Sequence, residues 1–207
     1  MDADDVRREW EGRDGAYSPR YYAYYGADEV SEAIASQLDD HGPADPAILE
    51  VGCSAGRHLA HLYDRGYRDL WGIDVNPESF SVLQETYPNL AEDGTFLVGA
   101  MEDILPGMPD AAFDLVYSVE TLQHIPHENA GVFEEVARIS GDLVVTVEVE
   151  REMAGQDGED AINYVDGDFP IYYRKWEQVF EEFGLVQLDS VDMGRQTMRV
   201  FHSPNGT

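Results

Sequence analysis

Two carboxylates, Glu50 and Asp74, lie at or near the ends of short apolar runs, beside a turn. The first run, Ile48 to Val51, leads into a small turn that contains Gly52 and Gly56, whereas the second run begins at Leu70 and ends in Asp74 itself. In an open α/β sheet such turns lie at the carboxyl ends of the strands, where small ligands bind. An acid that ends the second strand can accept hydrogen bonds from ribose hydroxyls. The spacing therefore predicts a nucleoside-binding site.

The turn after Glu50 distinguishes between classes of nucleoside. A dinucleotide fingerprint that began at Gly52 would need glycine at its third and sixth positions, where this chain has Ser54 and Arg57. Glu50 would repel a pyrophosphate, but it suits a ligand that carries a cationic amine. S-adenosylmethionine has that amine, a sulfonium and no phosphate. The turn therefore favours this cofactor over a nicotinamide dinucleotide.

Four segments in order make the chain resemble the class I S-adenosylmethionine-dependent methyltransferases, in their small-molecule branch. The segments are residues 50–56, 72–74, 99–106 and 113–124. The resemblance implies a cofactor site built from Glu50, Gly52, Cys53, Ser54, Gly56, Asp74, Val75, Ala100, Met101, Glu102 and Ser118.

The third segment departs from the family pattern at one position. Ala100 stands where many members carry the acid that meets the adenine amine. Either the backbone of Met101 reads the adenine alone, or Glu102 supplies the carboxylate from a shifted position.

The fourth segment bears on the methyl acceptor. It lacks the Asn/Asp-Pro-Pro-Tyr turn of enzymes that methylate adenine, cytosine or glutamine nitrogens, and it resembles the small-molecule branch, of whose Leu-His-His it keeps only His124. A histidine with a pKa near neutrality can act as a general base, so His124 is a candidate catalytic residue. The alternative is a structural histidine at the mouth of the strand.

Two aromatic clusters are candidates for closing the pocket. We expect Tyr22 and Tyr25 from the first cluster, and Tyr172 and Arg174 from the second, to bind substrate, with Tyr173 as a second catalytic residue. Aromatic rings can pack against a sulfonium, and an arginine can pair with a ligand carboxylate. Core packing explains both clusters equally well. The histidine pairs 58/61 and 124/127 lack a third ligand, so no metal site is predicted.

The charge of the chain is extreme, with 42 acidic against 13 basic residues, a net charge of −29 and a single lysine, Lys175. Such a surface is tolerated where salt screens it, as in the cytoplasm of an extreme halophile.

No cluster of basic residues suits nucleic acid, and no apolar run approaches the roughly 18 residues that span a bilayer. The acidic N-terminus does not resemble a signal peptide. We expect a cytoplasmic protein with a small-molecule partner and no membrane association, of undefined oligomeric state, in which Cys53, the only cysteine, fills space.

Alternating apolar and helical patterns place these residues in an α/β, Rossmann-like three-layer sandwich. Its seven-stranded sheet is mostly parallel with an antiparallel last strand, because the turn at 192–195 is too short for a crossover helix. We expect strands at 47–51, 69–74, 95–98, 113–118, 142–149, 185–191 and 196–202, and helices at 28–38, 56–65, 77–87, 128–139 and 174–183. Asn76 should cap the third of these helices, with Pro77 in its first turn.

The whole chain, 1–207, is expected to form one domain, with an N-terminal arm and helix over 1–45 and the Rossmann-like core over 46–207. Residues 150–168 leave the sheet on the ligand side and are either a lid or a disordered surface loop.

The predicted activity is methyl transfer from S-adenosylmethionine to oxygen, carbon or nitrogen of a small molecule. Methylation of a protein or tRNA is one alternative, and a non-catalytic protein that binds S-adenosylmethionine and regulates a partner is another. A nicotinamide oxidoreductase is disfavoured by Ser54 and Arg57.

Overall fold

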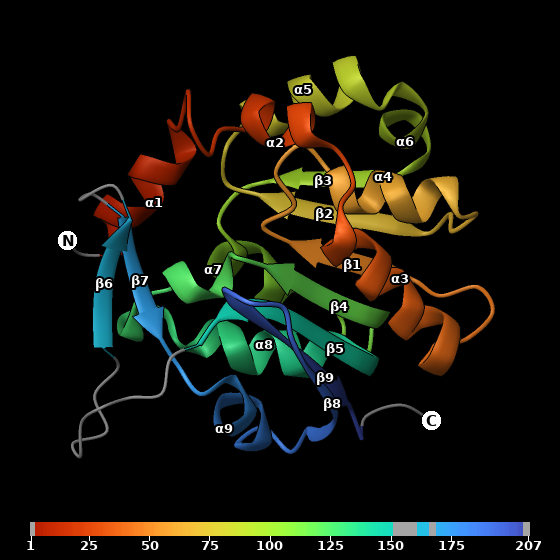
Figure 1. Ribbon diagram of the computed structural model, residues 1–207, viewed down its shortest axis with the longest axis vertical. Helices are drawn as coiled ribbons and strands as arrows, with labels where there is room; N and C mark the ends of the chain where they lie inside the picture. The colour runs from red at the N-terminus through yellow and green to blue at the C-terminus, as the bar shows by residue number, and fades with distance from the viewer. Residues whose placement is uncertain (1–2, 151–160, 166–168, 205–207) are drawn as a thin grey trace.

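Seven strands form one twisted sheet that runs through the middle of the molecule between two layers of helices (Figure 1). The computed structural model describes residues 3–150, 161–165 and 169–204. The strand order is β3-β2-β1-β4-β5-β9-β8, and β9 is antiparallel to both of its neighbours. The strands are β1 (Ile48–Val51), β2 (Leu70–Asp74), β3 (Thr95–Val98), β4 (Phe113–Val119), β5 (Ser140–Val149), β8 (Val186–Asp192) and β9 (Gln196–His202). The predicted fold class and the antiparallel last strand are confirmed.

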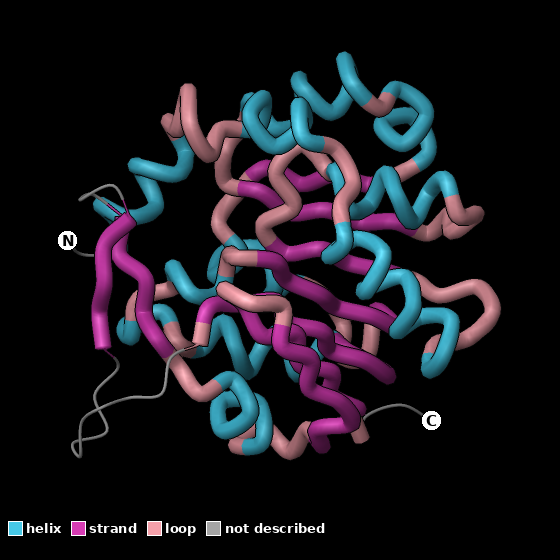
Figure 2. The backbone as a smooth tube through the Cα atoms, viewed as in Figure 1, coloured by secondary structure: helices cyan, strands magenta, loops and turns pink. Residues whose placement is uncertain are grey.

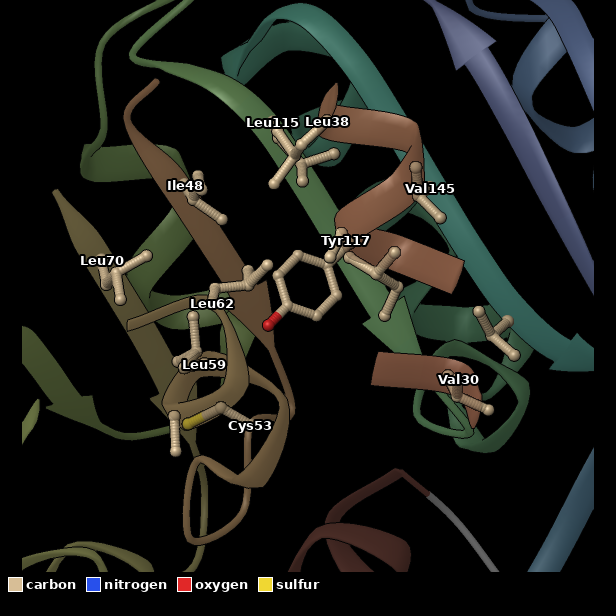
Figure 3. Packing of buried hydrophobic residues seen from close by; sticks show 14 of the residues in the cluster. Val30, Leu38, Ile48, Cys53, Leu59, Leu62, Leu70, Leu115, Tyr117 and Val145 are labelled. Atoms are coloured by element: carbon tan, nitrogen blue, oxygen red, sulfur yellow. The ribbon is translucent and has the colours of Figure 1, made fainter. Parts of the chain in front are cut away.

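Alternate residues of each central strand point into two separate cores. Ile48 and Tyr117 belong to the core that α3 (Glu29–His41), α4 (Arg57–Asp64), α5 (Glu78–Thr86) and α6 (Pro88–Asp93) cover. Leu49 and Val116 belong to the core under α7 (Met101–Ile104), α8 (Gly131–Ile139) and α9 (Trp176–Glu181). Figure 3 shows the Tyr117 ring inside the first core. Because both faces are buried, the strands read as nearly continuous apolar runs.

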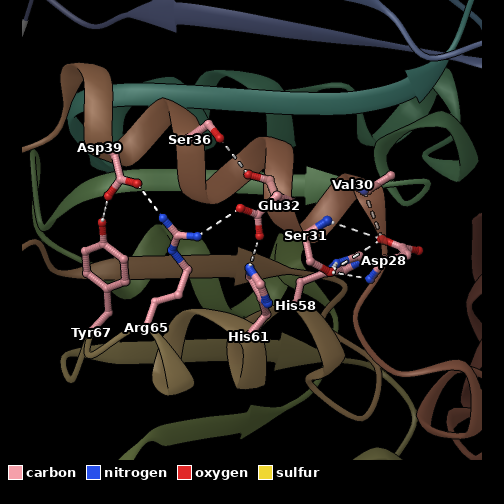
Figure 4. A network of polar contacts seen from close by, with 10 residues as sticks. All are labelled: Asp28, Val30, Ser31, Glu32, Ser36, Asp39, His58, His61, Arg65 and Tyr67. Carbon is pink, nitrogen blue, oxygen red and sulfur yellow. Dashed lines mark hydrogen bonds and ion pairs between the residues drawn. The ribbon is translucent and has the colours of Figure 1, made fainter.

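Polar contacts fix α3 against α4, the helix that begins at the candidate cofactor turn (Figure 4). Asp28 caps α3 by accepting hydrogen bonds from the Val30 and Ser31 amides. Arg57 Nη1 lies 2.6 Å from Asp28 Oδ2, and His58 Nδ1 lies 2.7 Å from Ser31 Oγ. These contacts hold the first turn of α4, and therefore the end of the cofactor turn, in one position.

Several short elements have no counterpart in the predicted pattern. The arm contains α1 (Ala3–Glu11) and α2 (Pro19–Tyr25), the latter capped by Ser18 with Pro19 in its first turn. A two-stranded hairpin of β6 (Ala161–Val165) and β7 (Phe169–Tyr173) lies beside α1, outside the main sheet (Figure 2). The hairpin occupies part of the expected lid, while residues 151–160 and 166–168 lie outside the described residues. α1 and the hairpin thus lie together at one end of the sheet (Figure 1).

Most predicted boundaries agree with the structure to within three residues. Pro77 directly precedes α5, which starts one residue later than predicted, and Asn76 Oδ1 still accepts a hydrogen bond from the Glu78 amide. Before α8, residues 127–129 form a 3₁₀ turn in place of the first predicted helical turn. Within the described ranges, no helix is long and apolar enough to cross a membrane.

Candidate functional site

A cavity of about 160 Å³ lies at the carboxyl ends of β1, β2 and β4, and a second cavity of about 30 Å³ adjoins it. The larger cavity is lined by most of the predicted cofactor residues, namely Glu50, Gly52, Cys53, Ser54, Asp74, Val75, Ala100, Met101 and Glu102. Residues that lie far apart in the sequence therefore meet at one site, as the parallel topology requires.

The backbone amides of the turn after β1 donate hydrogen bonds to acceptors within the protein. Gly52 and Cys53 both donate to Ile73 O, at 2.8 and 3.0 Å, and Gly56 donates to Cys53 O at 2.8 Å. The Ser54 amide donates to Asp74 Oδ2 at 2.7 Å. A phosphate site at such a turn needs amides that point at the ligand. These four amides are engaged, which favours a nucleoside ligand without a pyrophosphate.

Gly52 is required by its surroundings. Its φ of +73° is a left-handed conformation, and a Cβ atom there would lie 2.2 Å from Thr121 Oγ1. The cofactor turn therefore packs directly against the segment that follows β4.

Glu50 brings a buried carboxylate to the cavity wall. Its side chain is 1% exposed, and Tyr117 Oη donates a hydrogen bond to Oε2 at 3.0 Å. Burial raises the pKa of Glu50 to about 8, although the Tyr117 hydrogen bond and the nearby Arg57 oppose that shift. A ligand ammonium would restore the charged form of this carboxylate. The environment thus fits a ligand that carries a cationic amine.

Asp74 already accepts three hydrogen bonds. Besides the Ser54 amide, the Asn76 amide lies 2.8 Å and Ser79 Oγ 2.9 Å from Oδ1. Burial raises the pKa of Asp74, and these donors oppose the rise. A carboxylate offers about four lone-pair positions, so one remains for a ribose hydroxyl. Its predicted role in binding ribose stays a prediction.

Two predicted cofactor residues do not line the cavity. Gly56 adopts φ +74° at the start of α4, where a Cβ would lie 2.9 Å from Leu83 Cδ1. Ser118 Oγ donates to Glu148 Oε1 at 2.5 Å inside the sheet. Both residues therefore support the site from behind. Cys53 is buried with a raised pKa, which is consistent with a space-filling thiol and not with a nucleophile.

The segment after β3 contributes a buried methionine and a half-buried acid. Met101 is 8% exposed, and Glu102 Oε1 accepts a hydrogen bond from Asn129 Nδ2 at 3.0 Å. These positions are compatible with recognition of adenine by the Met101 backbone and with recognition by the Glu102 carboxylate.

The post-β4 loop, defined as residues 120–125, is held by a buried carboxylate at the end of β5. Glu148 is 0% exposed, and it accepts hydrogen bonds from the backbone amides of Thr121, Leu122 and Gln123 at 3.1 to 3.3 Å. Burial raises the pKa of Glu148 to about 7, against the opposing effect of Ser118 and these amides. Sequence reasoning missed this residue because an acid within an apolar strand gives no signal of its partners.

Arg174 holds the same loop from the other side. Its Nη2 donates to Ile125 O at 2.7 Å and its Nη1 to Leu122 O at 3.4 Å, and the guanidinium carbon lies 5.1 Å from the centre of the Tyr172 ring. The expectation that Arg174 pairs with a ligand carboxylate does not agree with this position, because the side chain is 5% exposed and does not line the cavity.

His124 borders both cavities and has a defined tautomer. Its Nδ1 lies 2.8 Å from Pro170 O, a pure acceptor, so Nδ1 carries the proton and Nε2 is a hydrogen-bond acceptor. The pKa of His124 is lowered to about 4 by burial, which outweighs the Pro170 hydrogen bond. The expected pKa near neutrality is therefore wrong, since the neutral ring is strongly favoured in this apolar environment.

The predicted aromatic residues divide into two groups. Tyr22 lines both cavities, and Arg57 lies 5.6 Å from the centre of its ring. Tyr25 is 60% exposed beside Tyr24, and neither Tyr172 nor Tyr173 lines either cavity. Tyr173 Oη accepts a hydrogen bond from Asn163 Nδ2 within the hairpin. Phe169 and Tyr173 share a face of β7 but lie at its opposite ends, and only Phe169 reaches the smaller cavity.

The N-terminal arm supplies several lining residues that were not predicted. Trp10, Arg13 and Tyr17 all line the larger cavity, and the Trp10 ring lies 4.8 Å from that of His124. A single tryptophan in an acidic helix gives no periodic signal, so sequence patterns could not place it there. The arm residues therefore line the cavity, with Trp10 beside His124.

Backbone strain is concentrated at this cavity. Tyr17, Ser54 and Glu120 line it with left-handed φ values of 62°, 49° and 49°, and Ala111 is the one other non-glycine residue with positive φ within the described ranges. Such conformations are retained where the surrounding structure imposes them, and they cluster at functional sites.

The histidine pairs noted in the sequence have other partners. His58 is buried against Ser31, and His61 Nε2 lies 2.9 Å from Glu32 Oε2. Among the residues that the structure describes, no group of three or more histidine, cysteine or acidic side chains is placed to hold a metal ion.

Comparison of the sequence with known proteins agrees with this geometry. Residues 48–141 match the family described as "Methyltransferase domain". Ajmaline N-methyltransferase from Rauvolfia serpentina is 27% identical over 152 residues, which is 68% of this chain and 52% of that protein. The chain spans about half or less of the length of the curated relatives it matches.

Solved structures share the fold over nearly the whole chain. A Haloferax volcanii protein solved in complex with the Trm112 methyltransferase activator has a TM-score of 0.70 at 16% identity, covering 98% of this chain and 99% of that one. Magnesium protoporphyrin IX methyltransferase from Synechocystis PCC 6803, solved with bound SAH, has a TM-score of 0.67 at 12% identity, covering 97% and 98%. At these identities the likeness establishes the fold alone.

Proposed function

We propose that this chain, which belongs to the class I S-adenosylmethionine-dependent methyltransferases, transfers a methyl group to oxygen, carbon or nitrogen of a small molecule. The observation that carries the proposal is that residues of the N-terminal arm form part of the cavity wall. Trp10, Tyr17 and Tyr22 line both cavities together with His124, and the space that they border suits a compact acceptor. A folded protein or RNA would have to displace this arm.

The residues at the sheet edge fit S-adenosylmethionine by their chemistry. Glu50 suits the cationic amine, Asp74 retains an acceptor position for ribose, and the segment of Met101 and Glu102 suits the adenine. The engaged amides of the turn are compatible with a ligand that has no phosphate. When bound, the cofactor supplies an electrophilic methyl group on a sulfonium.

The protein's own contribution is alignment and exclusion of water. Glu148 and Arg174 fix the post-β4 loop from opposite sides, so His124 presents Nε2 from a rigid support. Holding an acceptor in line with a reactive group can supply much of a rate enhancement. His124 Nε2 can also take a proton from an acceptor, since its neutral form is present at physiological pH.

A direct test is incubation of the purified protein, a small-molecule extract of its source cells and methyl-labelled S-adenosylmethionine. We expect label in a compound of low molecular mass, identified by mass spectrometry. Label only in protein or RNA would refute the small-molecule proposal. Tight cofactor binding with no labelled product from any fraction would favour the non-catalytic regulator.

A second candidate function is that of a catalytic subunit that requires an activator protein. Its support is the full-length likeness to the Haloferax volcanii protein that binds an activator, together with exposed apolar residues on both edge strands. Val98 on β3 is 53% exposed, and Val186 and Leu188 on β8 are 59% and 48% exposed. Edge strands with apolar side chains can accept a partner strand. Turnover that appears only after co-expression with a small partner protein would favour this candidate.

A further inference from the structure

The smaller cavity is a side branch of the larger one. The two share Trp10, Tyr17, Tyr22, Glu120 and His124 as lining residues, so a ligand in one is in reach of the other. The branch is closed by Gln123, Phe169 and Arg195. Nine of the predicted cofactor residues line the larger cavity and none of them lines the branch, which leaves the branch for the acceptor.

Glu120 brings an incompletely paired carboxylate to this branch. Its side chain is 23% exposed, and no hydrogen bond to it is found among the described residues. The nearest cation is Arg195, whose Nη2 lies 3.8 Å from Glu120 Oε1 and whose side chain is 61% exposed. A half-buried carboxylate without donors gains from a ligand that supplies them.

The other polar atoms of the branch add a second acceptor. His124 Nε2 is unprotonated, because Nδ1 carries the proton that is donated to Pro170 O, and it accepts a long hydrogen bond from Gln123 Nε2, at 3.4 Å. On the donor side, Trp10 Nε1 is buried with no hydrogen-bond partner among the described residues. The branch therefore suits a ligand in which one group donates hydrogen bonds and a nearby oxygen accepts one.

Aromatic rings surround these acceptors. The Trp10 and Phe169 ring centroids lie 4.6 Å apart. The Arg13 guanidinium lies 4.3 Å from the centre of the Phe169 ring, and the Arg57 guanidinium lies 5.6 Å from that of Tyr22. Ring faces attract cations, and rings next to a carboxylate are typical of sites for organic ammonium ions. These rings thus already associate with cations of the protein itself.

The backbone of Glu120 supports a functional reading of its side chain. Its φ of 49° is unfavourable for a residue with a Cβ and would be relaxed by glycine. The strained conformation directs a carboxylate to the cavity wall.

We propose that the branch is the acceptor subsite and that it binds a compact organic amine in its protonated form, with Glu120 as the anionic contact. This inference rests on the proposed methyltransferase function. The bound amine releases its N–H proton to His124 Nε2 or to solvent, and its lone pair then takes the methyl group as the S–CH3 bond breaks and S-adenosylhomocysteine is left. A carboxylate among aromatic rings suits both the protonated amine that enters and the more highly methylated ammonium that leaves, because both are cations. The buried Trp10 Nε1 favours amines that carry an oxygen, such as amino alcohols.

The test is a calorimetric titration of the full chain, saturated with S-adenosylhomocysteine, in molar KCl. The probes are dimethylaminoethanol, its neutral isostere isoamyl alcohol, and isovalerate as an anion of similar shape. We expect the amine to bind at least about tenfold more tightly than either of the others, the factor that corresponds to one charge-assisted contact. Glu120→Gln should remove this preference. Glu134→Gln, an equal change of charge at an exposed site on α8, should keep it.

Glu120→Gly is a second variant, in which the left-handed backbone at position 120 is no longer strained. It should abolish the preference for the amine while raising the melting temperature, because it relieves the left-handed backbone. Equal binding of the amine and isoamyl alcohol, tighter binding of isovalerate, or an unchanged preference in Glu120→Gln would each overturn the inference. Failure of the unmodified protein to bind S-adenosylhomocysteine in the first step would instead refute the proposed function.

Discussion

The buried carboxyl of Glu50 is expected to make cofactor binding depend on pH. In the free protein its carboxyl has a pKa of about 8, well above the value of about 4.3 for an exposed glutamate. The folded state thus favours the neutral form, and the stability that this preference contributes is present at low pH and is lost as pH rises from about 4.3 to about 8. A bound ammonium group would make the folded state favour the charged carboxylate instead.

We therefore expect the affinity for S-adenosylhomocysteine to rise between about pH 6 and about pH 8, by up to about tenfold per pH unit, as binding displaces fewer protons. Glu50→Gln should bind weakly at every pH in this range, yet the free variant should melt above the unmodified protein near pH 8. Calorimetry in buffers of different ionisation enthalpy measures the proton release. An affinity that is flat with pH would show that Glu50 does not meet the ammonium.

His124 has a different relation to pH, because its pKa is depressed to about 4. Its neutral form is present throughout the physiological range, so turnover should show no acidic limb from His124 above about pH 5. We expect His124→Ala to lower kcat by about 10²-fold if the ring accepts a proton, with cofactor affinity within about twofold.

Tyr173→Phe is the matched control for that variant. Tyr173 was a catalytic candidate in the sequence, but it lines neither cavity, and its hydroxyl accepts a hydrogen bond from Asn163 within the hairpin. Its substitution should leave kcat nearly unchanged. A loss of turnover in Tyr173→Phe as large as that in His124→Ala would mean that the division between cavity and hairpin proposed here is wrong.

At the scale of elements, the post-β4 loop depends on one carboxylate at the end of β5. Glu148→Gln replaces an acceptor oxygen with an amide donor that faces the Thr121, Leu122 or Gln123 amides. We expect the free energy of unfolding to fall by about 1–3 kcal/mol, the range for a lost hydrogen bond to a buried charge. The value of kcat should fall as well, while S-adenosylhomocysteine affinity changes little.

Chemical denaturation and single-turnover assays measure these two effects. Glu92→Gln, at an exposed position on α6, is the control for the change in charge. If Glu148→Gln unfolds at the same denaturant concentration and turns over at the same rate as the unmodified protein, the loop does not depend on this residue.

The elements of the sheet could be predicted because each has a local signal. Apolar runs such as Ile48 to Val51, followed by glycine turns, indicate parallel strands and fix the edge where ligands bind. The cofactor half of the cavity follows from this topology. The acceptor half does not, because Trp10, Tyr17 and Glu120 reach it through the path of the arm and a left-handed backbone, neither of which has a periodic pattern. Arg174 was misread for the same reason, since its partners are backbone carbonyls of a distant loop.

At the scale of the whole molecule, the net charge of −29 dominates the surface. Acids outnumber bases so strongly that many carboxylates have no cationic partner, and at low ionic strength they repel one another. We expect the melting temperature to fall by many degrees when KCl is diluted from molar to low concentration, because the screening distance grows from about 3 Å to about 10 Å or more.

Circular dichroism melts over a KCl series measure this dependence. Potassium sulfate at matched ionic strength helps to separate screening from effects on apolar hydration. A melting temperature that is independent of salt would show that the acidic surface does not limit stability and would remove the argument for a halophilic habitat.

The central claim is that the cavity at the carboxyl ends of β1 and β2 binds S-adenosylmethionine and no dinucleotide. Titration of the purified chain with S-adenosylmethionine and with NAD, in the same molar KCl buffer, tests it most directly. We predict saturable binding of S-adenosylmethionine at one site per chain, lost on substitution of Gly52 by Ala, and no measurable binding of NAD. Binding of NAD with no binding of S-adenosylmethionine would contradict the account.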